Sequence, residues 1–492
     1  MRLVIAAIVV AAVGAFALVQ TEPVAERPPD FGVPPAETVG ASGDPSAWYC
    51  PWVVSGALRD STFNLGSMMD VNATITLPNP NPTEDPSINE TRLRGPGARS
   101  IDAGDIVRRG TAPGVVEFDD GPAVATTVMW SEEILTGDRC VASVPKEWHL
   151  VGGITAEGFT LELQLFNPFA ESAKVTIEAI TEFGRSPLAG FESFDVPGRS
   201  WVTEDLSRVI PFLDMATFTV TSESGIVIPS LILNNENDEA SWPGTGQSTI
   251  WDFPVTSLPG LEPTLVISNT GSVGATVAID LFTPDGPILD ADGRIVAPLE
   301  PLRIHLADLA EPPFAVRVRS NAPIGAIIQA APEGTFPRTD ILPPEEEVGD
   351  ESTDEDAPDD EATDEDTADT TGDEESEEPV VYDGLAAMPG NTDPLERWLV
   401  PGLGVVPGAE TSIWILNPSD ERATVTVSPL GVSAVSSEKI VIPAGRYVEI
   451  PMPSLSESGN SGMLIDASLP VSVAVSIAGP QGVAFIGGVG VG

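Results

Sequence analysis

Two histidines and two cysteines are present in 492 residues, and these side chains are the usual components of metal sites and nucleophilic centres. His149 lies beside a tryptophan in PKEWHLVGG, residues 145–153, and His305 is far from it in the sequence. No H-E-x-x-H motif surrounds either histidine, and a G-x-S-x-G motif is absent. The sequence therefore predicts no catalytic residue, no metal and no cofactor, and we expect both histidines to have structural or surface roles.

Carboxylates offer two further kinds of chemistry. The run Asp290-Ala291-Asp292-Gly293 resembles the start of a calcium-binding loop, but the third acidic ligand and the closing glutamate are missing. It lies between two segments that we expect to be strands, which favours a hairpin turn with Gly293 at positive φ. Paired carboxylates for glycoside hydrolysis are defined by distance in the fold, so an envelope enzyme with carboxylate catalysis stays a remote alternative.

The composition and the amino terminus indicate an exported β protein. Forty-eight prolines, 46 glycines and many valines, isoleucines and threonines favour strands separated by turns. Residues 3–19 are apolar and follow Arg2, as in an export signal. We predict a single-pass membrane anchor with the bulk of the chain extracytoplasmic, or, alternatively, a secreted protein whose signal is cleaved after Ala15-Phe16-Ala17.

The two cysteines fit this location. Cys50 and Cys140 are the one available pair, and an oxidising compartment allows a disulfide to persist. We predict that they are bonded, with two unpaired buried thiols as the alternative.

Acidic residues dominate the charge. The net charge is −51, of which residues 343–379 contribute −20 without one basic residue, so that −31 remains elsewhere. This sign argues against nucleic acid as a partner. A run of like charges with few apolar residues predicts a disordered spacer, and binding of divalent cations or a basic partner is the alternative. We expect this spacer to make the last module separately mobile.

One spacing pattern recurs four times. Apolar residues at alternate positions precede an anchor residue by four and two, and they resume six, eight and ten residues after it. A period of two predicts strands with one buried face, and the Asn-Pro step found in two copies ends the first strand. Each copy closes with an apolar strand, a small polar turn and a second apolar strand. The anchors are Ser67, Asn167, Asn269 and Asn417.

The anchors are 100, 102 and 148 residues apart, and about 100 residues with several short strands is the size of an immunoglobulin-like sandwich. We therefore predict an all-β chain of four tandem immunoglobulin-like β-sandwich modules. A single propeller of four large blades is the alternative, although propeller repeats are usually only about 40–50 residues long. The predicted boundaries are 1–22 for the signal segment, 23–46 for a proline-rich linker, 47–144, 145–240 and 241–340 for modules 1 to 3, 341–380 for the acidic linker and 381–492 for module 4.

A tryptophan precedes each anchor by 18 or 19 residues. These residues are Trp48, Trp148, Trp251 and Trp398. A large residue that recurs at one structural position is more often packed in a core or a domain joint than exposed as a ligand platform. His149 is then the neighbour of a structural tryptophan.

The motifs also carry a resemblance. Cys140, EWHLVGG (147–153), LQLFNPF (163–169) and VPGRS (196–200), with AWYCP (47–51) upstream, resemble an actinobacterial family of uncharacterised exported proteins with a domain of unknown function. The resemblance implies an amino-terminal membrane segment, extracytoplasmic β domains and no established activity.

Two functions are compatible with these features. The first is a non-catalytic extracytoplasmic scaffold in the cell envelope, whose partners would be envelope proteins. The second is a module that binds cell-wall glycan through exposed tryptophans stacked on sugar rings. Burial of the four repeated tryptophans would exclude them from the second role.

Overall fold

The computed structural model describes residues 46–338 and 380–491, apart from gaps at 57–58, 82–83, 108–109, 112, 120, 236–237, 432–436 and 453–460. In this part of the chain nearly all regular structure is strand, and the helices are α2 (Leu206–Val209) and two single 3-10 turns, η1 (Ala103–Asp105) and η2 (Leu306–Asp308). The all-β prediction is confirmed. The signal segment lies outside the described residues, and so do the proline-rich linker and the acidic linker except at their last positions, 46 and 380. Within the described residues, no helix is long and apolar enough to cross a membrane.

Each of the four repeats contributes two antiparallel sheets. In module 2 the first sheet has the order β11-β17-β13-β14, with β15 also on β13, and the second has the order β16-β12-β18-β19. The chain crosses between the two sheets after β11, β12, β15, β16 and β17, so that neighbours in a sheet come from distant sequence. The strands are β11 (Glu147–Gly153), β12 (Phe159–Asn167), β13 (Ala173–Thr181), β14 (Gly184–Pro187), β15 (Phe194–Val196), β16 (Ser200–Asp205), β17 (Ala216–Ser224), β18 (Ile228–Asn235) and β19 (Asp238–Pro243).

Module 1 repeats this arrangement with the orders β1-β8-β4-β5 and β10-β9-β3-β6. A separate two-stranded sheet, β2-β7, lies beside them. The strands are β1 (Ser46–Cys50), β2 (Val54–Ser55), β3 (Asp60–Ser67), β4 (Val71–Leu77), β5 (Ser87–Leu93), β6 (Gly97–Asp102), β7 (Gly110–Thr111), β8 (Gly114–Phe118), β9 (Ala123–Trp130) and β10 (Leu135–Arg139).

In modules 3 and 4 one long strand takes part in both sheets. β25 pairs with β22 through residues 315–320 and with β21 through residues 325–332, and β32 joins β29 to β28 in the same way. The predicted turns at Pro323 and Pro470 are therefore wrong, because the chain stays extended there. Each proline lies at the crossover between sheets, where its missing N–H interrupts no ladder.

The strands of module 3 are β20 (Ser248–Phe253), β21 (Leu261–Asn269), β22 (Ala275–Thr283), β23 (Gly286–Val296), β24 (Glu300–His305), β25 (Ala315–Pro332) and β26 (Ala386–Pro389). Those of module 4 are β27 (Leu395–Pro401), β28 (Glu410–Asn417), β29 (Ala423–Pro429), β30 (Glu438–Ile442), β31 (Arg446–Met452), β32 (Gly462–Gly479), β33 (Gly482–Gly487) and β34 (Val489–Gly490).

The acidic linker does not separate module 3 from module 4. β26 follows the linker in sequence but pairs with β25, through Ile327↔Pro389 to Ala330↔Ala386. Residues 386–389 thus complete a sheet of module 3, and the predicted boundary at 381 is too early. The edge of β25 offers unpaired backbone groups that a strand must cover, and the returning chain supplies that strand. Both ends of the linker are therefore held by module 3, which contradicts a separately mobile module 4.

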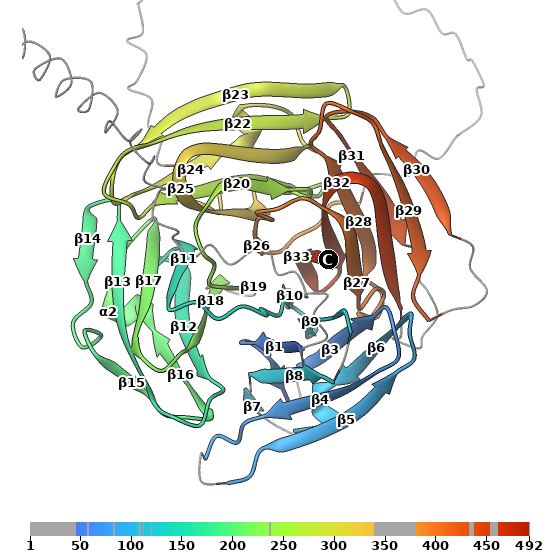
Figure 1. Cartoon of the computed structure of the whole chain (residues 1–492). Coiled ribbons are helices and arrows are strands. Elements are labelled where there is room, and N and C mark those ends of the chain that lie inside the picture. Colours follow the sequence, from blue (N-terminus) through green and yellow to red (C-terminus); the bar gives the residue numbers. More distant parts are fainter. Residues whose placement is uncertain are drawn as a thin grey trace, which may run out of the picture.

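The four modules close into a ring (Figure 1). One edge strand of each two-sheet unit (β10, β19, β26 or β33) lies at the centre of the ring, and each contacts the next around the axis. Modules 1 and 4 also meet directly, since Leu399 and Val489 belong to the hydrophobic core of module 1. The hydrophobic cores extend from one module into the next, so the four modules pack as a single ring and are not separate domains joined only by linkers.

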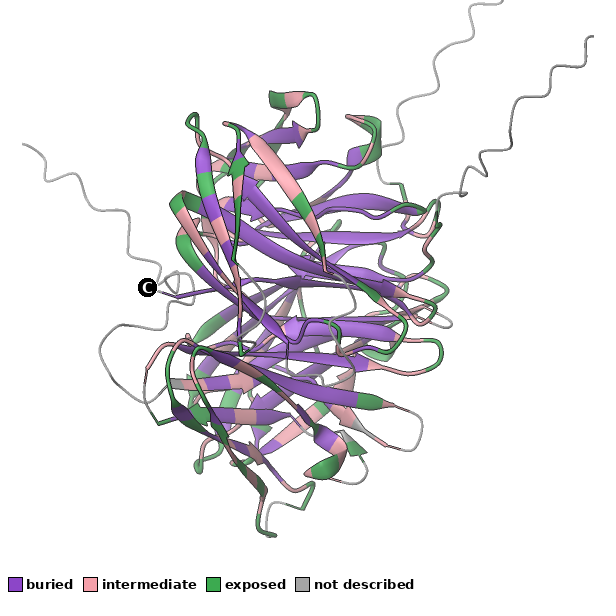
Figure 2. Cartoon of the chain, turned by 90° about the vertical axis from the view of Figure 1, so that its right-hand side faces the viewer, coloured by how far each residue is buried: buried purple, intermediate pink, exposed green. Residues whose placement is uncertain are grey.

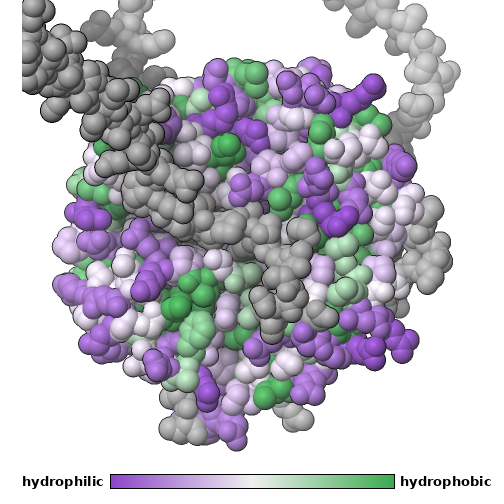
Figure 3. Space-filling view, viewed as in Figure 1, coloured by the Kyte–Doolittle hydropathy of each residue, from purple (hydrophilic) through white to green (hydrophobic). Residues whose placement is uncertain are grey.

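Burial follows the predicted alternation. Every apolar residue at the repeat offsets is at most 6% exposed, with Val427 the most exposed of them. Strands are buried along most of their length, and exposed residues gather at turns and on outer strands (Figure 2). The face seen along the axis mixes hydrophilic and hydrophobic residues, with hydrophilic side chains prevailing at the periphery (Figure 3).

The Asp290–Gly293 run lies inside β23 and does not form the predicted hairpin turn. The turn comes earlier, at Gly286, which has φ 148°. The residue with a left-handed backbone in the run is Asp290, at φ 51°, where the pairing of β22 with β23 shifts register. Asp280 accepts the backbone N–H of Asp290 at 2.9 Å. Aspartate tolerates this conformation, and the bulge places the Asp290 carboxylate 2.8 Å from Arg319.

Candidate functional site

The four repeated tryptophans point inward. All are at most 2% exposed. Three of them donate their indole N–H to the backbone carbonyl where the later strand of the other sheet begins: Trp48 to Ala123 (2.9 Å), Trp251 to Ile324 (3.0 Å) and Trp398 to Val471 (3.0 Å). These bonds join the two sheets of a module, so the tryptophans are structural and form no solvent-facing row.

The repeated asparagines close the turn that follows their strand. Each accepts the N–H two residues later and donates to the carbonyl four residues later. Each also donates to the carbonyl at the end of a strand on the opposite sheet, Asn167 to Val196, Asn269 to Val296 and Asn417 to Ile442. All three asparagines are at most 1% exposed. Their geometry satisfies buried backbone groups and leaves no atom for a ligand.

The predicted disulfide between Cys50 and Cys140 is present. Next to it, Tyr49 and Val141 exchange two backbone hydrogen bonds of 2.8 and 2.9 Å. The disulfide therefore ties β1, the first strand of module 1, to the segment that follows β10. His149 is 5% exposed and contacts Glu147 at 3.3 Å and Thr219 at 3.4 Å, which is a structural environment.

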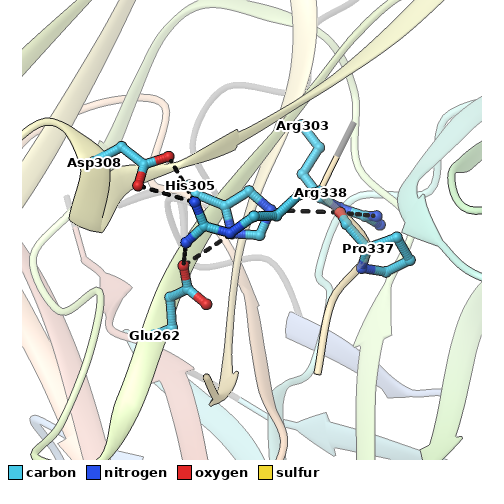
Figure 4. A network of polar contacts seen from close by, with 6 residues as sticks. All are labelled: Glu262, Arg303, His305, Asp308, Pro337 and Arg338. Atoms are coloured by element: carbon cyan, nitrogen blue, oxygen red, sulfur yellow. Dashed lines mark hydrogen bonds and ion pairs between the residues drawn. The ribbon is translucent and has the colours of Figure 1, made fainter. Parts of the chain in front are cut away.

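His305 belongs to a polar network at the start of the acidic linker (Figure 4). Its Nδ1 lies 3.0 Å from Glu262, and Arg338 donates to the same carboxylate at 2.8 Å. Arg303 is fully buried, donates to the Pro337 carbonyl at 3.4 Å and has its pKa lowered to about 10 by burial. The network fixes residues 337–338 against β24 and β21 through Arg303, His305 and Glu262, so we assign it a structural role.

A second group of buried acids lies at the joint between modules 1 and 2. Asp138 accepts a hydrogen bond from Ser241, and burial raises the pKa of Asp138 to about 7. Glu239 accepts from Trp52 at 3.1 Å and from Arg59 at 3.0 Å. Burial raises the pKa of Glu239, and these two donors only partly offset that effect. Each carboxylate is enclosed and partnered, which suits a joint and not a ligand site.

A cavity of about 590 Å³, bordered by described residues, lies between modules 3 and 4. We call it the 3–4 groove. Its floor is the outer face of the sheet that contains β28. Ile413 and Ile415 point into the core of module 4, whereas the alternate residues Ser412 and Trp414 line the groove. A volume of this size is typical of ligand sites.

Aromatic side chains span the groove. Trp414 is 3% exposed, donates to the Ser476 hydroxyl at 2.9 Å and stacks on Tyr447 with 5.8 Å between ring centroids. Tyr447 donates to the Pro313 carbonyl of module 3 at 3.1 Å. The Tyr382 hydroxyl donates to Glu410 of module 4 at 2.8 Å. The backbone N–H of Tyr382 donates to the Pro259 carbonyl of module 3. The two tyrosines therefore hold the walls of the groove at a fixed separation.

Carboxylates occupy the rim. Glu311, Glu410 and Glu449 line the groove and are exposed, and among the described residues that line it there is no lysine, arginine or histidine. A second cavity of about 330 Å³ shares Tyr382 and Glu410 with the groove and adds Asp383. Burial, followed by the hydrogen bond to Glu410, raises the pKa of Tyr382 to about 12. The phenol stays protonated near neutral pH and continues to donate to Glu410.

Sequence reasoning did not single out the groove. One signal was available in the repeat, at the position between the two apolar residues that precede the anchor. That position holds Asn64, Gln164 and Val266 in modules 1 to 3 but Trp414 in module 4. A tryptophan on the face of a strand that points away from the core of its own module indicates that a neighbouring module packs against this face. The glutamates carry no comparable signal, because three separate segments supply them.

Comparison with known proteins gives one informative match. No curated protein matches the sequence at a significant level. A solved structure from Thermotoga maritima, "Crystal Structure of Thermotoga maritima 1070", is 23% identical over 18% of this chain and 84% of that chain, with a TM-score of 0.17, too low to support a conclusion. The motifs around Cys140, EWHLVGG and VPGRS lie within a matched segment, which confirms the resemblance to a domain of unknown function: residues 121–232 match the model of a family of unknown function (DUF5719).

Proposed function

We propose that the protein is a non-catalytic extracytoplasmic scaffold of the cell envelope that binds other proteins, built from four tandem immunoglobulin-like sandwich modules. The modules resemble immunoglobulin domains in size and in having two antiparallel layers. Their strand order differs, because the first strand of each module (β1, β11, β20 and β27) joins the sheet opposite to the one that holds β3, β12, β21 or β28. In an immunoglobulin domain the first two strands share a sheet. Function in such sandwiches depends on the surfaces that they carry.

The observation that carries the proposal is the use of the repeated residues. The repeated tryptophans and asparagines form hydrogen bonds between the two sheets of a module. Hydrophobic cores that extend from one module into the next close the ring. What is left for recognition is a rigid outer surface and the grooves between modules. The Cys50–Cys140 bond supports an oxidising compartment outside the cytoplasm.

Cell-wall glycan binding is the second candidate. The four repeated tryptophans are buried and offer no surface on which a sugar ring could stack. Their burial argues against a role for these four residues in glycan binding. Tyr382 and Tyr447, two partly exposed aromatic residues near the 3–4 groove, favour it, since sugar rings stack on such side chains.

In-cell photo-crosslinking tests the scaffold. A photoreactive residue at Val381, 72% exposed beside the groove, would be compared with one at Phe183, 85% exposed on module 2. We expect discrete crosslinks to envelope proteins from at least one of these positions, and protease added outside the cells should digest the ring. Retention on purified wall polysaccharide without any protein crosslink would contradict the scaffold and favour the glycan alternative.

A further inference from the structure

The charge of the 3–4 groove is unbalanced in a way that other carboxylate clusters of the ring are not. Asp252 is bound by Arg317 at 2.7 Å, and Asp280 by Arg319 at 2.7 Å. In contrast, Glu311, Glu410 and Glu449 line the groove without a basic side chain among its lining residues. Negative charges along a concave, low-dielectric wall concentrate the field and attract cations.

The pKa values of two tyrosines reflect this negative charge. After burial, the charge of Glu449 raises the pKa of Tyr447, and Glu410 and Glu449 together raise that of Tyr382. Tyr382, which lines the groove, and Tyr447, which stacks on Trp414, thus both experience the negative charge of the rim glutamates. The groove is complementary to a positive group and disfavours an anion.

The floor adds a requirement of its own. Ala478 on the floor, together with Leu258 and Leu261 of module 3 on the facing wall, supplies apolar surface, which suits methylene groups. Ser412 lines the cavity and is only 9% exposed, yet its hydroxyl has no hydrogen-bond partner among the described residues. Because Ser412 lines the cavity, its hydroxyl oxygen can accept a hydrogen bond from a donor that a ligand carries.

The shape argues for an extended ligand and against a metal ion. Among the described residues, no three acidic, histidine or cysteine side chains are grouped closely enough to hold a metal. The carboxylates are spread along an open groove that continues past Tyr382 into the second cavity with Asp383. Dispersed charges over this length suit several cationic groups carried by one segment.

The acidic linker supports the same ligand. Its sequence carries 20 acidic residues between positions 343 and 379 and leads directly into Val380, which lines both cavities. A high local negative charge raises the rate at which cationic partners arrive. The acidic residues that precede Val380 in the sequence have the same sign of charge as the rim of the groove and favour the same class of ligand.

We propose that the 3–4 groove binds a basic segment of a partner protein by taking up a lysine or arginine side chain, with its stem on the apolar floor and its cationic group among Glu311, Glu410 and Glu449. This inference rests on the proposed scaffold function and names the chemistry of its partner.

Calorimetric titration of the purified full-length chain tests the site. The probe is the peptide acetyl-(Lys-Gly)3-amide, and the variant is Glu311→Gln/Glu410→Gln/Glu449→Gln. The matched control is Glu132→Gln/Glu133→Gln/Glu157→Gln, three exposed carboxylates outside the groove with the same change in net charge. We expect the dissociation constant to rise at least about tenfold in the groove variant and to stay within about twofold of wild type in the control.

Three further arms separate the alternatives. Ser412→Leu, which extends an apolar side chain into the cavity without changing charge, should also weaken the peptide. An isosteric peptide with norleucine in place of lysine should not bind. Free cadaverine should bind more weakly than the peptide; if it binds as tightly, a small amine and not a protein segment is the ligand. Equal affinity of the peptide for the groove variant and the charge-matched control would overturn the proposal.

The outcomes also separate this inference from the scaffold function. Protein crosslinks at Val381 that persist while the peptide shows no dependence on the groove carboxylates would refute the site and leave the scaffold standing. Peptide binding that requires those carboxylates, without any protein crosslink in cells, would support the site and refute the scaffold.

Discussion

Two contacts between modules use the same residue types for opposite purposes. At the joint of modules 1 and 2, Glu239 is 3% exposed and accepts from a tryptophan, Trp52, and an arginine, Arg59. At the 3–4 groove, Trp414 donates to a serine, and the glutamates on the rim have no basic neighbour among the lining residues. The first contact is closed and neutralised, and the second is open and negative.

The comparison teaches that the surroundings of a carboxylate decide its role. A buried carboxylate needs donors, because desolvation costs several kcal/mol unless it is paired or protonated. An exposed carboxylate keeps its hydration and can exchange water for a ligand. Glu239 and Asp138 therefore serve the ring, whereas Glu410 and Glu449 are available to a partner.

The largest expected effect concerns the covalent link of module 1, which has no counterpart beside the groove. The double substitution Cys50→Ser/Cys140→Ser opens a loop with a sequence separation of 90 residues. We expect the free energy of unfolding to fall by about 4 kcal/mol, an upper value from the chain-entropy model. Urea denaturation measures it, and reduced wild-type protein is the control. A change below about 1 kcal/mol would show that packing alone closes module 1.

The next effect separates the closed joint from the groove by its pH dependence. The pKa of Asp138 is about 7 in the folded chain, above its ordinary value of 3.8, so the folded chain holds an extra proton between these values. This stabilisation is complete at low pH and is lost as the pH rises through 7.

Asp138→Asn should remove this slope. We expect the stability of the variant relative to wild type to improve by about 2–4 kcal/mol between pH 4 and pH 8, measured by urea denaturation at both values. Asp60→Asn, at an exposed residue of β3, serves as the control and should leave the slope unchanged. Parallel pH profiles for wild type and Asp138→Asn would contradict the assignment.

A smaller effect tests the pairing of Glu239. Arg59→Met leaves this carboxylate buried with Trp52 as its remaining donor, and we expect a loss of about 1–3 kcal/mol at pH 8. The loss should shrink at pH 5, where the carboxyl group can take up a proton. Arg92→Met removes the exposed partner of Asp70 and should cost less than about 0.5 kcal/mol. If the two variants lost the same free energy of unfolding, the ion pair at the joint of modules 1 and 2 would be no more important for stability than the exposed pair, contrary to this prediction.

The smallest effect is expected at the groove itself. Glu311→Gln/Glu410→Gln/Glu449→Gln should change the free energy of unfolding by no more than about 0.5 kcal/mol, because exposed charges contribute little and these three repel one another. Thermal unfolding followed by circular dichroism checks this. A loss above about 2 kcal/mol would mean that the groove carboxylates are structural like Glu239, and the distinction between the two contacts would fail.

Much of the local structure could be predicted from the sequence. The offsets around Asn167, Asn269 and Asn417 place alternating residues on one buried face, because a strand has a side-chain period of two. The asparagines close their turns through backbone groups two and four residues away, which is a local interaction. The pairing of Cys50 with Cys140 follows from their number and the predicted compartment.

The tertiary structure alone decided how these pieces meet. β26 joins module 3 across the whole acidic linker, and the strand at Pro323 continues where the composition indicated a turn. The groove needs residues from three stretches, near positions 258, 311 and 380, beside the sheet of module 4. The pattern within a strand is set by neighbours in the chain, whereas these features depend on which exposed edges and faces remain to be covered once all four modules are packed around the axis. The sequence by itself therefore determined the repeating unit and its buried face, and only the folded ring determined the closed joint and the open groove.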